Sequence, residues 1–321
     1  MRFLSPKTDF AFKKIFGSRQ SKGILISFLN ALLYGGTETI VDLEIIDPYQ
    51  VPPTAGLKDS FLDVKATVTT VTGMETVIIE MQVLNVSAFQ KRVLYNAAKA
   101  FCIQLESGHS YTRLNPVIAL TITDFEMFPE HNKVISRYYL KEEVENSVYT
   151  DAFRFVFVEL PKFHKSLEEL ETLTDQWIYF VKTAGTLEGV PESLTNSEPL
   201  NQAFTIAERG RLSRKELEIL EKQEMFIEDQ RNHITLASQQ GLEQGIQQGI
   251  QQGLEQGIQQ GIQQGLEQGI QQGLEQGVQQ GQRQQAIDIA RSLLGILPVD
   301  VIAEKTGLTI AEVEGLQEPQ D

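Results

Sequence analysis

The sequence predicts an α/β or α+β fold, in which helices pack against a mixed β-sheet. Two observations support this prediction. Apolar residues make up 41% and aromatic residues 8% of the 321 residues, which fits a folded chain with a sizeable core. Along residues 8–160 the predicted elements follow the order helix, strand, hairpin, helix and strand.

The first predicted elements are two helices and a strand. Thr8 or Asp9 is expected to cap the first helix, and Gly17 to end it. Apolar residues at helical spacing predict a second helix over 22–33. The β-branched run IVDLEII predicts a strand over 40–46.

Two further runs rich in Val, Ile and Thr predict an antiparallel hairpin. They cover residues 60–70 and 75–83 and flank a short turn that contains Gly73. The other predicted elements are expected to support this hairpin or to extend from it.

Three polar residues interrupt the hairpin: Asp63 on the first strand, and Glu80 and Gln82 on the second. Residues two apart on a strand share a face, so Glu80 and Gln82 point the same way. With Asp63 on that face, two carboxylates and an amide would converge, an arrangement that suits Mg²⁺. Glu80 lies within the apolar run VIIEMQV, where an unpartnered carboxylate is costly to bury. The alternative explanation is an ion pair with Lys58, Lys65 or Arg92.

After the hairpin, the pattern predicts a helix over 87–105 and strands over 115–123 and 154–160. Further helices are expected over 166–188 and 202–237. One stripe of the helix over 87–105 carries Arg92, Tyr95, Asn96 and Lys99.

From residue 241 to 281 the chain repeats a four-residue unit that begins with glycine, followed by Leu, Ile or Val. A repeat of four exceeds 3.6 residues per turn, so an aliphatic stripe would drift by about 40° per repeat in a right-handed sense. Glycine costs about 1 kcal/mol per helical position, or about 11 kcal/mol over the tract. Two interpretations therefore stay open: a helix that self-associates, or a semi-helical spacer.

Residues 286–318 return to ordinary globular composition and predict a small helical module. The segment IAEKTGLTIAEVEGL resembles a helix-turn-helix. Its second helix carries Glu312 and Glu314 but no Lys or Arg, whereas helices that read DNA bring positive charge to the groove. Packing or oligomerisation is the favoured interpretation, with DNA contact as the alternative.

The net charge of −15 is unevenly distributed. Residues 1–120 contain 12 Lys and Arg against 10 Asp and Glu, a net charge of +2, and residues 121–321 contain 16 against 33, a net charge of −17. The slightly basic part contains the hairpin, which is compatible with a phosphate backbone as ligand.

Composition also argues against several classes of protein. The single cysteine, Cys102, excludes an internal disulfide, and the N-terminus lacks the apolar run of a signal peptide. No apolar stretch approaches the length of a membrane span, so we expect a cytoplasmic protein without membrane contact. The four histidines have no zinc-ligand spacing.

Four sequence blocks, in this order, carry a resemblance to a known family: TDFAFKKIFG, KDSFLDVKA, IIEMQV and QKRVLYNAAKAF. Together they resemble the Rpn (recombination-promoting nuclease or transposase) family of the PD-(D/E)XK nuclease superfamily. The glycine tract and the C-terminal module resemble tails common in that family. The resemblance implies a restriction-endonuclease-like core, a mixed sheet flanked by helices, with a helical Gly-rich C-terminal tail. It also implies hydrolysis of DNA with a divalent cation: Mg²⁺, or Mn²⁺ or Ca²⁺.

The resemblance places Asp63 at the superfamily's Asp and Glu80 at its Asp or Glu. The backbone carbonyl of Met81 would complete the metal site. Gln82 stands where the motif more often has a lysine, although Glu-x-Gln also resembles this family's own form. Glutamine has no titratable proton near neutral pH, so the metal would have to do most of the water activation. Leu62 replaces the superfamily's Pro.

Further residues are weaker candidates for the same site. Asp9 is a candidate for an additional carboxylate, with helix capping as the alternative. The candidates for DNA contact are Lys13, Lys14, Arg92, Tyr95 and Lys99, with an ordinary solvated surface as the alternative.

The leading hypothesis is therefore a Mg²⁺-dependent DNA endonuclease linked to recombination or transposition. The alternative is a catalytically weak or inactive DNA-binding or assembly protein that self-associates through its C-terminal repeat. The predicted organisation is a nuclease-like domain over 1–200, a charged helix over 201–237, the repeat over 238–285 and the helical module over 286–321.

Overall fold

The computed structural model describes residues 2–50 and 60–317. The chain divides into two compact units, residues 1–235 and 236–321. Lys58, one of the alternative ion-pair partners considered for Glu80, lies outside the described residues, as does most of the loop that precedes it.

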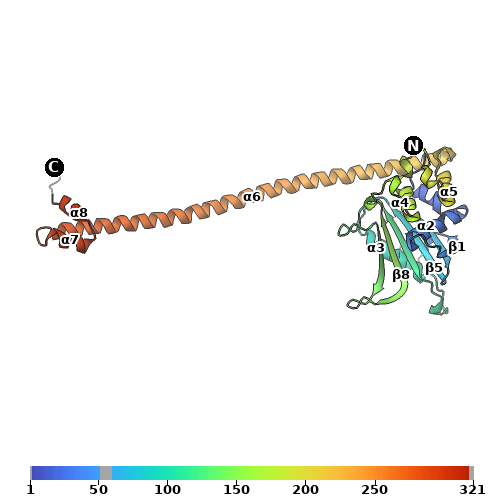
Figure 1. Ribbon diagram of the computed structural model, residues 1–321, viewed down its shortest axis with the longest axis horizontal. Helices are drawn as coiled ribbons and strands as arrows, with labels where there is room; N and C mark the ends of the chain where they lie inside the picture. Colours follow the sequence, from blue (N-terminus) through green and yellow to red (C-terminus); the bar gives the residue numbers. More distant parts are fainter. Residues whose placement is uncertain (1, 51–59, 318–321) are drawn as a thin grey trace. The chain divides into compact units, whose positions relative to one another are not determined.

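A six-stranded mixed sheet forms the centre of the first unit, in the order β1-β4-β5-β6-β8-β7 (Figure 1). Its strands are β1 Ile40–Ile46, β4 Val64–Thr70, β5 Met74–Gln82, β6 Val117–Thr123, β7 Ile135–Lys141 and β8 Val148–Glu159. β5, β6 and β8 run parallel to one another, and the remaining neighbours pair antiparallel. A separate ribbon joins β2 Tyr49–Gln50 to β3 Ser60–Phe61. The predicted class, a mixed sheet flanked by helices, is confirmed.

Helices cover both faces of this sheet. One face packs against α1 Asp9–Phe16, α2 Lys22–Tyr34, α4 Leu173–Thr183 and α5 Glu198–Ala207. The other face packs against α3 Phe89–Cys102. Single 3₁₀ turns lie at Arg19–Ser21, Tyr111–Arg113, Leu160–Lys162, Leu167–Glu169, Ala184–Thr186, Glu192–Leu194 and Arg209–Arg211.

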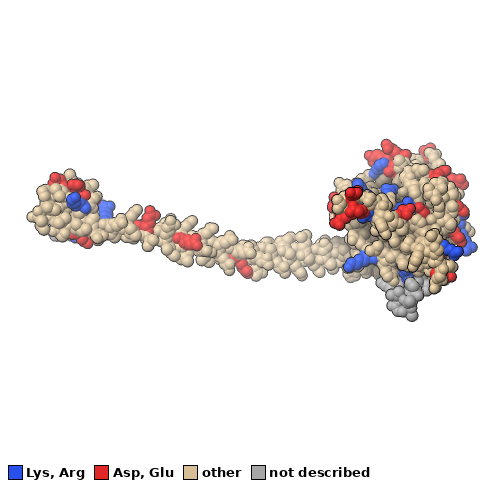
Figure 2. Space-filling view, turned by 90° about the horizontal axis from the view of Figure 1, so that it is seen from below, with Lys and Arg blue, Asp and Glu red and all other residues tan. Residues whose placement is uncertain are grey.

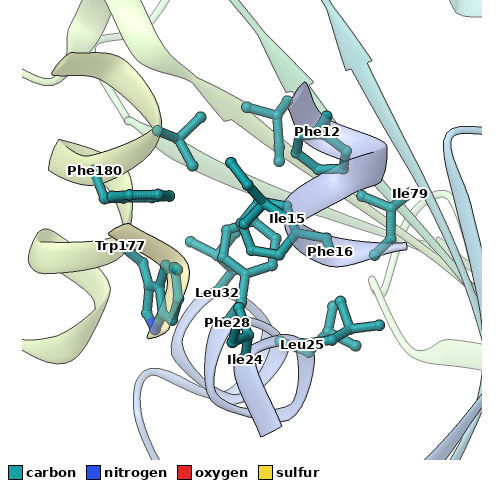
Figure 3. Close-up of a cluster of buried hydrophobic side chains, with 14 of the residues drawn as sticks. Phe12, Ile15, Phe16, Ile24, Leu25, Phe28, Leu32, Ile79, Trp177 and Phe180 are labelled. Atoms are coloured by element: carbon teal, nitrogen blue, oxygen red, sulfur yellow. The ribbon is translucent and has the colours of Figure 1, made fainter. Parts of the chain in front are cut away.

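An aromatic cluster fills the larger core, between α1, α2 and α4 (Figure 3). The rings of Phe16 and Phe28 lie 4.4 Å apart, and Trp177 meets Phe28 edge-on at 5.5 Å. All three side chains are fully buried. Because each large aromatic buries 150–250 Å² or so of surface, this cluster is a main source of the free energy that holds the helices on the sheet.

Asn30 connects α2 to the first strand from a buried position. Its Nδ2 donates to the carbonyl of Ile40 at 3.1 Å, and its Oδ1 accepts from the backbone N–H groups of Ile40 at 2.8 Å and Thr39 at 3.1 Å. One amide therefore satisfies three backbone groups where β1 begins.

The structure confirms several local predictions. Thr8, rather than Asp9, caps α1 through its side chain, and Gly17 ends that helix. Gly73, at φ +153°, lies in the hairpin turn, as expected.

Other local predictions were wrong. The first strand of the hairpin does not begin at residue 60, because residues 60 and 61 pair with β2 instead. Strand β7 was missed, since its residues are mostly exposed and its sequence ISRYYLK lacks an alternating pattern. The helix expected over 202–237 is two helices, because residues 208–213, which include the 3₁₀ turn at Arg209–Arg211, separate α5 from α6.

The helix α6 Arg214–Leu293 continues from the first unit into the second. It includes the whole glycine tract, where a Cβ added to any tract glycine would meet nothing within 4 Å. Two short helices, α7 Val299–Thr306 and α8 Ile310–Gly315, follow it. A small core around Ala290, Ile302 and Val313 holds this module together, so the predicted helices of the module are confirmed.

Replacing Asn30 with alanine should destabilise the first unit by about 2–4 kcal/mol, because it leaves buried backbone groups of β1 unpaired. Urea unfolding followed by Trp177 fluorescence measures this, since Trp177 is the chain's one tryptophan and lies in that unit's core. Asn232→Ala on the exposed surface of α6 is the matched control and should change stability by less than about 0.5 kcal/mol. Equal destabilisation in both variants would contradict the assignment.

Candidate functional site

A cavity of about 760 Å³ lies between the end of β5 and the start of α3. It is lined by Ser60, Phe61, Asp63, Glu80, Met81, Gln82, Ser87, Ala88, Lys91, Arg92, Tyr95 and Asn96. All three of the main residues predicted from the sequence are therefore brought to one cavity.

Asp63 lies directly before β4. Val64 pairs with Ile79, so continuation of this antiparallel register sets Asp63 opposite Glu80. The Oδ2 of Asp63 accepts a hydrogen bond from the backbone N–H of Met81 at 2.6 Å. This bond directs the carboxylate toward the end of β5.

Burial raises the pKa of Asp63 to about 7, and its hydrogen bond and repulsion with Asp9 act in the same direction. The Met81 N–H and the Lys13 ammonium oppose this rise in pKa. Asp63 is thus a carboxyl group held in a setting that favours its neutral form unless further positive charge is added.

Glu80 points from β5 toward α3. Its Oε1 accepts a hydrogen bond from Asn96 Nδ2 at 2.8 Å. Its Oε2 is buried and has no hydrogen-bond partner among the described residues. Burial raises the pKa of Glu80, while the Arg92 charge and the Asn96 hydrogen bond lower it. The alternative explanation, an ion pair with Lys65, is not observed among the described residues, and Asn96 is the hydrogen-bond partner of Glu80.

Gln82 is held at both ends of its amide. Its Nε2 donates to the carbonyl of Leu84 at 2.8 Å, and its Oε1 accepts from the guanidinium of Arg92. Arg92 also lies over the ring of Phe89, 4.9 Å from its centre. Gln82, the last residue of β5, is therefore hydrogen-bonded to a permanent positive charge on α3.

The start of α3 forms another wall of the cavity. Ala88 precedes the helix in the left-handed region, at φ +62°, and makes no side-chain capping bond. This conformation costs a non-glycine residue about 1–2 kcal/mol. Such strain is concentrated at functional sites, and here it fixes the direction in which α3 leaves the cavity.

Asp9 lies on the other side of Asp63, on α1. The Lys13 Nζ lies 2.5 Å from the Asp9 carboxylate and 3.7 Å from Asp63 Oδ1. Asp9 lines a second cavity of about 470 Å³, whose wall also includes Met81 and Gln82. The described residues contain no group of three or more His, Cys, Asp or Glu arranged to hold a metal ion. The geometry thus offers a two-carboxylate site, with Asp9 beside it.

The remaining candidates for DNA contact are dispersed. Arg92 and Tyr95 line the first cavity, and Tyr95 is 40% exposed. Lys14 forms an ion pair with Glu216 of α6 at 2.5 Å. Lys99 is buried, 5.9 Å from the centre of the Tyr95 ring. Figure 2 shows Lys and Arg mixed with Asp and Glu on the visible face of the first unit, without a continuous basic surface.

Asn96 is a residue of the candidate site whose contact with Glu80 sequence reasoning missed. Its place on the same helical stripe as Arg92 was visible in the sequence, but its partner was not. The available signal was a match of spacing: Arg92 and Asn96 are four apart on α3, and Glu80 and Gln82 are two apart on β5. These intervals are both roughly 6–7 Å long.

The residues fit a hard divalent cation. Asp63 and Glu80 supply carboxylate oxygens to one cavity, and the Oε2 of Glu80 is a buried acceptor without a partner among the described residues. Mg²⁺ is commonly bound by one or two carboxylates with waters and phosphate oxygens. The donor set is therefore sufficient for one such ion.

A model of the family described as PD-(D/E)XK nuclease family transposase matches residues 6–237. The match contains both strands of the hairpin and ends close to the boundary between the two units. No curated protein and no solved structure matches the chain significantly. None of the described helices is long and apolar enough to cross a membrane.

The raised pKa of Asp63 predicts a pH-dependent stability in the presence of a chelator. Between about pH 4 and pH 7 the unfolded chain releases this proton while the folded chain keeps it, so stability falls as the pH rises. Asp63→Asn should remove this loss and be about 2–4 kcal/mol more stable than wild type at pH 7.5, with little difference at pH 4.

Urea unfolding followed by Trp177 fluorescence measures this difference. Asp151→Asn, at an exposed position on β8, is the control and should follow the wild type at every pH. A constant difference between Asp63→Asn and wild type over this range would contradict the prediction.

Proposed function

Because this chain belongs to the PD-(D/E)XK nuclease family transposases, we propose that it is a Mg²⁺-dependent DNA endonuclease linked to recombination or transposition. The observation that carries the proposal is that Asp63, directly before β4, and Glu80, on β5, both line one cavity. Two such carboxylates, together with waters and phosphate oxygens, can hold a cation beside a phosphodiester.

Nucleases of the PD-(D/E)XK superfamily typically use divalent metal ions. In this proposal Asp63, Glu80 and the backbone carbonyl of Met81 hold Mg²⁺, and Mn²⁺ or Ca²⁺ would be alternative occupants. The bound ion would activate a water molecule and stabilise charge on the phosphate. The pKa of Asp63, raised to about 7, means that cation binding near neutral pH would release protons from this carboxyl group.

Gln82 and Arg92 act as a pair in the proposed reaction. Gln82 orients the attacking water but cannot accept its proton, because an amide does not titrate near neutral pH. Arg92, hydrogen-bonded to Gln82 Oε1, brings the positive charge that the superfamily's lysine would otherwise supply. This charge is permanent, so it stabilises a phosphate at any physiological pH.

The proposed DNA contacts lie around the cavity mouth. Arg92 and Tyr95 line the cavity, and Lys91 adds an exposed charge beside the uncapped start of α3. Backbone N–H groups at a helix start favour phosphate. Lys13 lies beside Asp63, whereas Lys14 and Lys99 are engaged within the protein and would contact DNA only after rearrangement.

Alanine at Asp63 or at Glu80 should lower the rate of plasmid cleavage with Mg²⁺ or Mn²⁺ by at least about 100-fold, because the cation supplies several kcal/mol of charge stabilisation. Conversion of supercoiled to nicked and linear DNA measures the rate. Asp151→Ala is the matched control, with wild-type cleavage expected. Equal cleavage by both site variants and the wild type would refute the proposed function.

The alternative function is a DNA-binding or assembly protein with little or no catalysis. The observation that favours this alternative is the identity of residue 82. Gln82 stands where the motif more often has a lysine, and its amide is already hydrogen-bonded to Arg92 and to the Leu84 carbonyl. Salt-dependent DNA binding without metal-dependent cleavage would support this alternative.

We also propose that the tract over 241–281 of α6 binds a second copy of the chain. Its aliphatic side chains are all exposed, between 49% for Val278 and 69% for Leu274. Eleven glycines in the tract cost a lone helix about 11 kcal/mol. Close packing against another helix would offset that cost, because glycine lets two backbones approach.

Light scattering of the full chain and of a chain ending at residue 240 tests this proposal. The full chain should have at least twice its monomer mass, and the shortened chain should be a monomer. Residues 1–235 form a compact unit, so the shortened chain keeps the first core. A monomeric full chain would identify the tract as a spacer.

A further inference from the structure

Two hydrogen-bonded residues that line the first cavity each have a buried oxygen acceptor without a hydrogen-bond partner among the described residues. These acceptors are Oε2 of Glu80 and Oδ1 of Asn96. Asn96 is only 2% exposed, and both residues line the cavity. Buried polar atoms in folded proteins are nearly always satisfied, so a pair of unsatisfied acceptors indicates a ligand that offers positive charge or hydrogens.

The orientation of the Asn96 amide follows from its neighbour. Its Nδ2 donates to Glu80 Oε1 at 2.8 Å, which leaves Oδ1 as the free end. The reversed amide would place Oδ1 against a carboxylate oxygen, and two acceptors repel each other unless one carries a proton. The observed orientation is therefore the one that an ionised Glu80 requires.

We propose that Asn96 is a further oxygen donor of the cation site, in addition to Asp63, Glu80 and the backbone carbonyl of Met81. Its Nδ2 holds Glu80 in place, and its Oδ1 binds the cation or accepts from one of the cation's waters. This inference rests on the proposed function, because it concerns the same ion. It assigns a role to a helix residue that lies outside the strand motif Asp…Glu-x-Gln.

The chemistry of an asparagine suits this position. An amide oxygen is a hard, neutral ligand of the kind that Mg²⁺, Mn²⁺ and Ca²⁺ accept. A third carboxylate here would add a like charge directly beside Glu80, whose pKa is already raised by burial. Asparagine supplies an oxygen to the cation and a donor to Glu80 at once, whereas an aspartate can supply only the oxygen.

Titration of the full chain with Mn²⁺, in the absence of DNA, tests the role of Asn96 directly. Asn96→Leu removes both amide functions, and its dissociation constant for Mn²⁺ should rise 10- to 100-fold, the usual effect of losing a supporting group. Asn96→Asp keeps an oxygen for the cation but loses the donor to Glu80, so its affinity should fall clearly less than that of Asn96→Leu. Isothermal titration calorimetry measures each constant.

The same two substitutions at exposed Asn85 are the matched controls, and both should bind Mn²⁺ as the wild type does. Where Asn96→Leu does not fold, as judged by circular dichroism and Trp177 fluorescence, Asn96→Ala replaces it with the same expected loss. Unchanged affinity in Asn96→Leu or Asn96→Ala would overturn the inference. A loss in Asn96→Asp equal to that in Asn96→Leu would overturn the role of Oδ1 and leave only the Glu80 contact.

Glu80→Ala separates failure of this inference from failure of the proposed function. If Glu80→Ala binds Mn²⁺ and cleaves DNA as the wild type does, the proposed function is wrong, and the inference fails with it. If Glu80→Ala loses both properties while Asn96→Leu binds Mn²⁺ normally, only the role of Asn96 is refuted.

Discussion

The register between β5 and α3 is the constraint on which the candidate site depends. Glu80 and Gln82, two apart on the strand, meet Asn96 and Arg92, four apart on the helix. Both intervals span roughly 6–7 Å, so the two hydrogen bonds form together. A slip of one residue in the strand would turn both polar side chains into the larger core on the opposite face.

Two apolar cores hold this register from either side of the sheet. Ile79 and Met81 pack toward α1 and α2, while Ile78 packs toward α3, so β5 is buried on both faces. Close packing makes such a strand difficult to shift. The polar residues at its end are consequently presented to the cavity from a rigid base, which the positioning of a cation and a phosphate requires.

Sequence reasoning predicted the fold class and brought Asp63, Glu80 and Gln82 together, because their strands have strong local patterns and a short turn. It did not find that Asn96 binds Glu80, since that contact joins residues 16 apart through the docking of a helix on a sheet. It also could not foresee that Lys14 pairs with Glu216, 202 residues away. Local periodicity predicts the elements, whereas partners across elements depend on tertiary packing.

The electrostatics of the site explain how a glutamine can stand where the superfamily more often has a lysine. A lysine at position 82 would lie within reach of Arg92, and two cations so close together would repel. Glutamine instead accepts a hydrogen bond from Arg92 and fixes the guanidinium at the cavity wall. The positive charge is therefore still present, but α3 supplies it rather than β5. In the proposed function, Arg92, held by Gln82, would replace the lysine's charge, although neither residue would replace its capacity to transfer a proton.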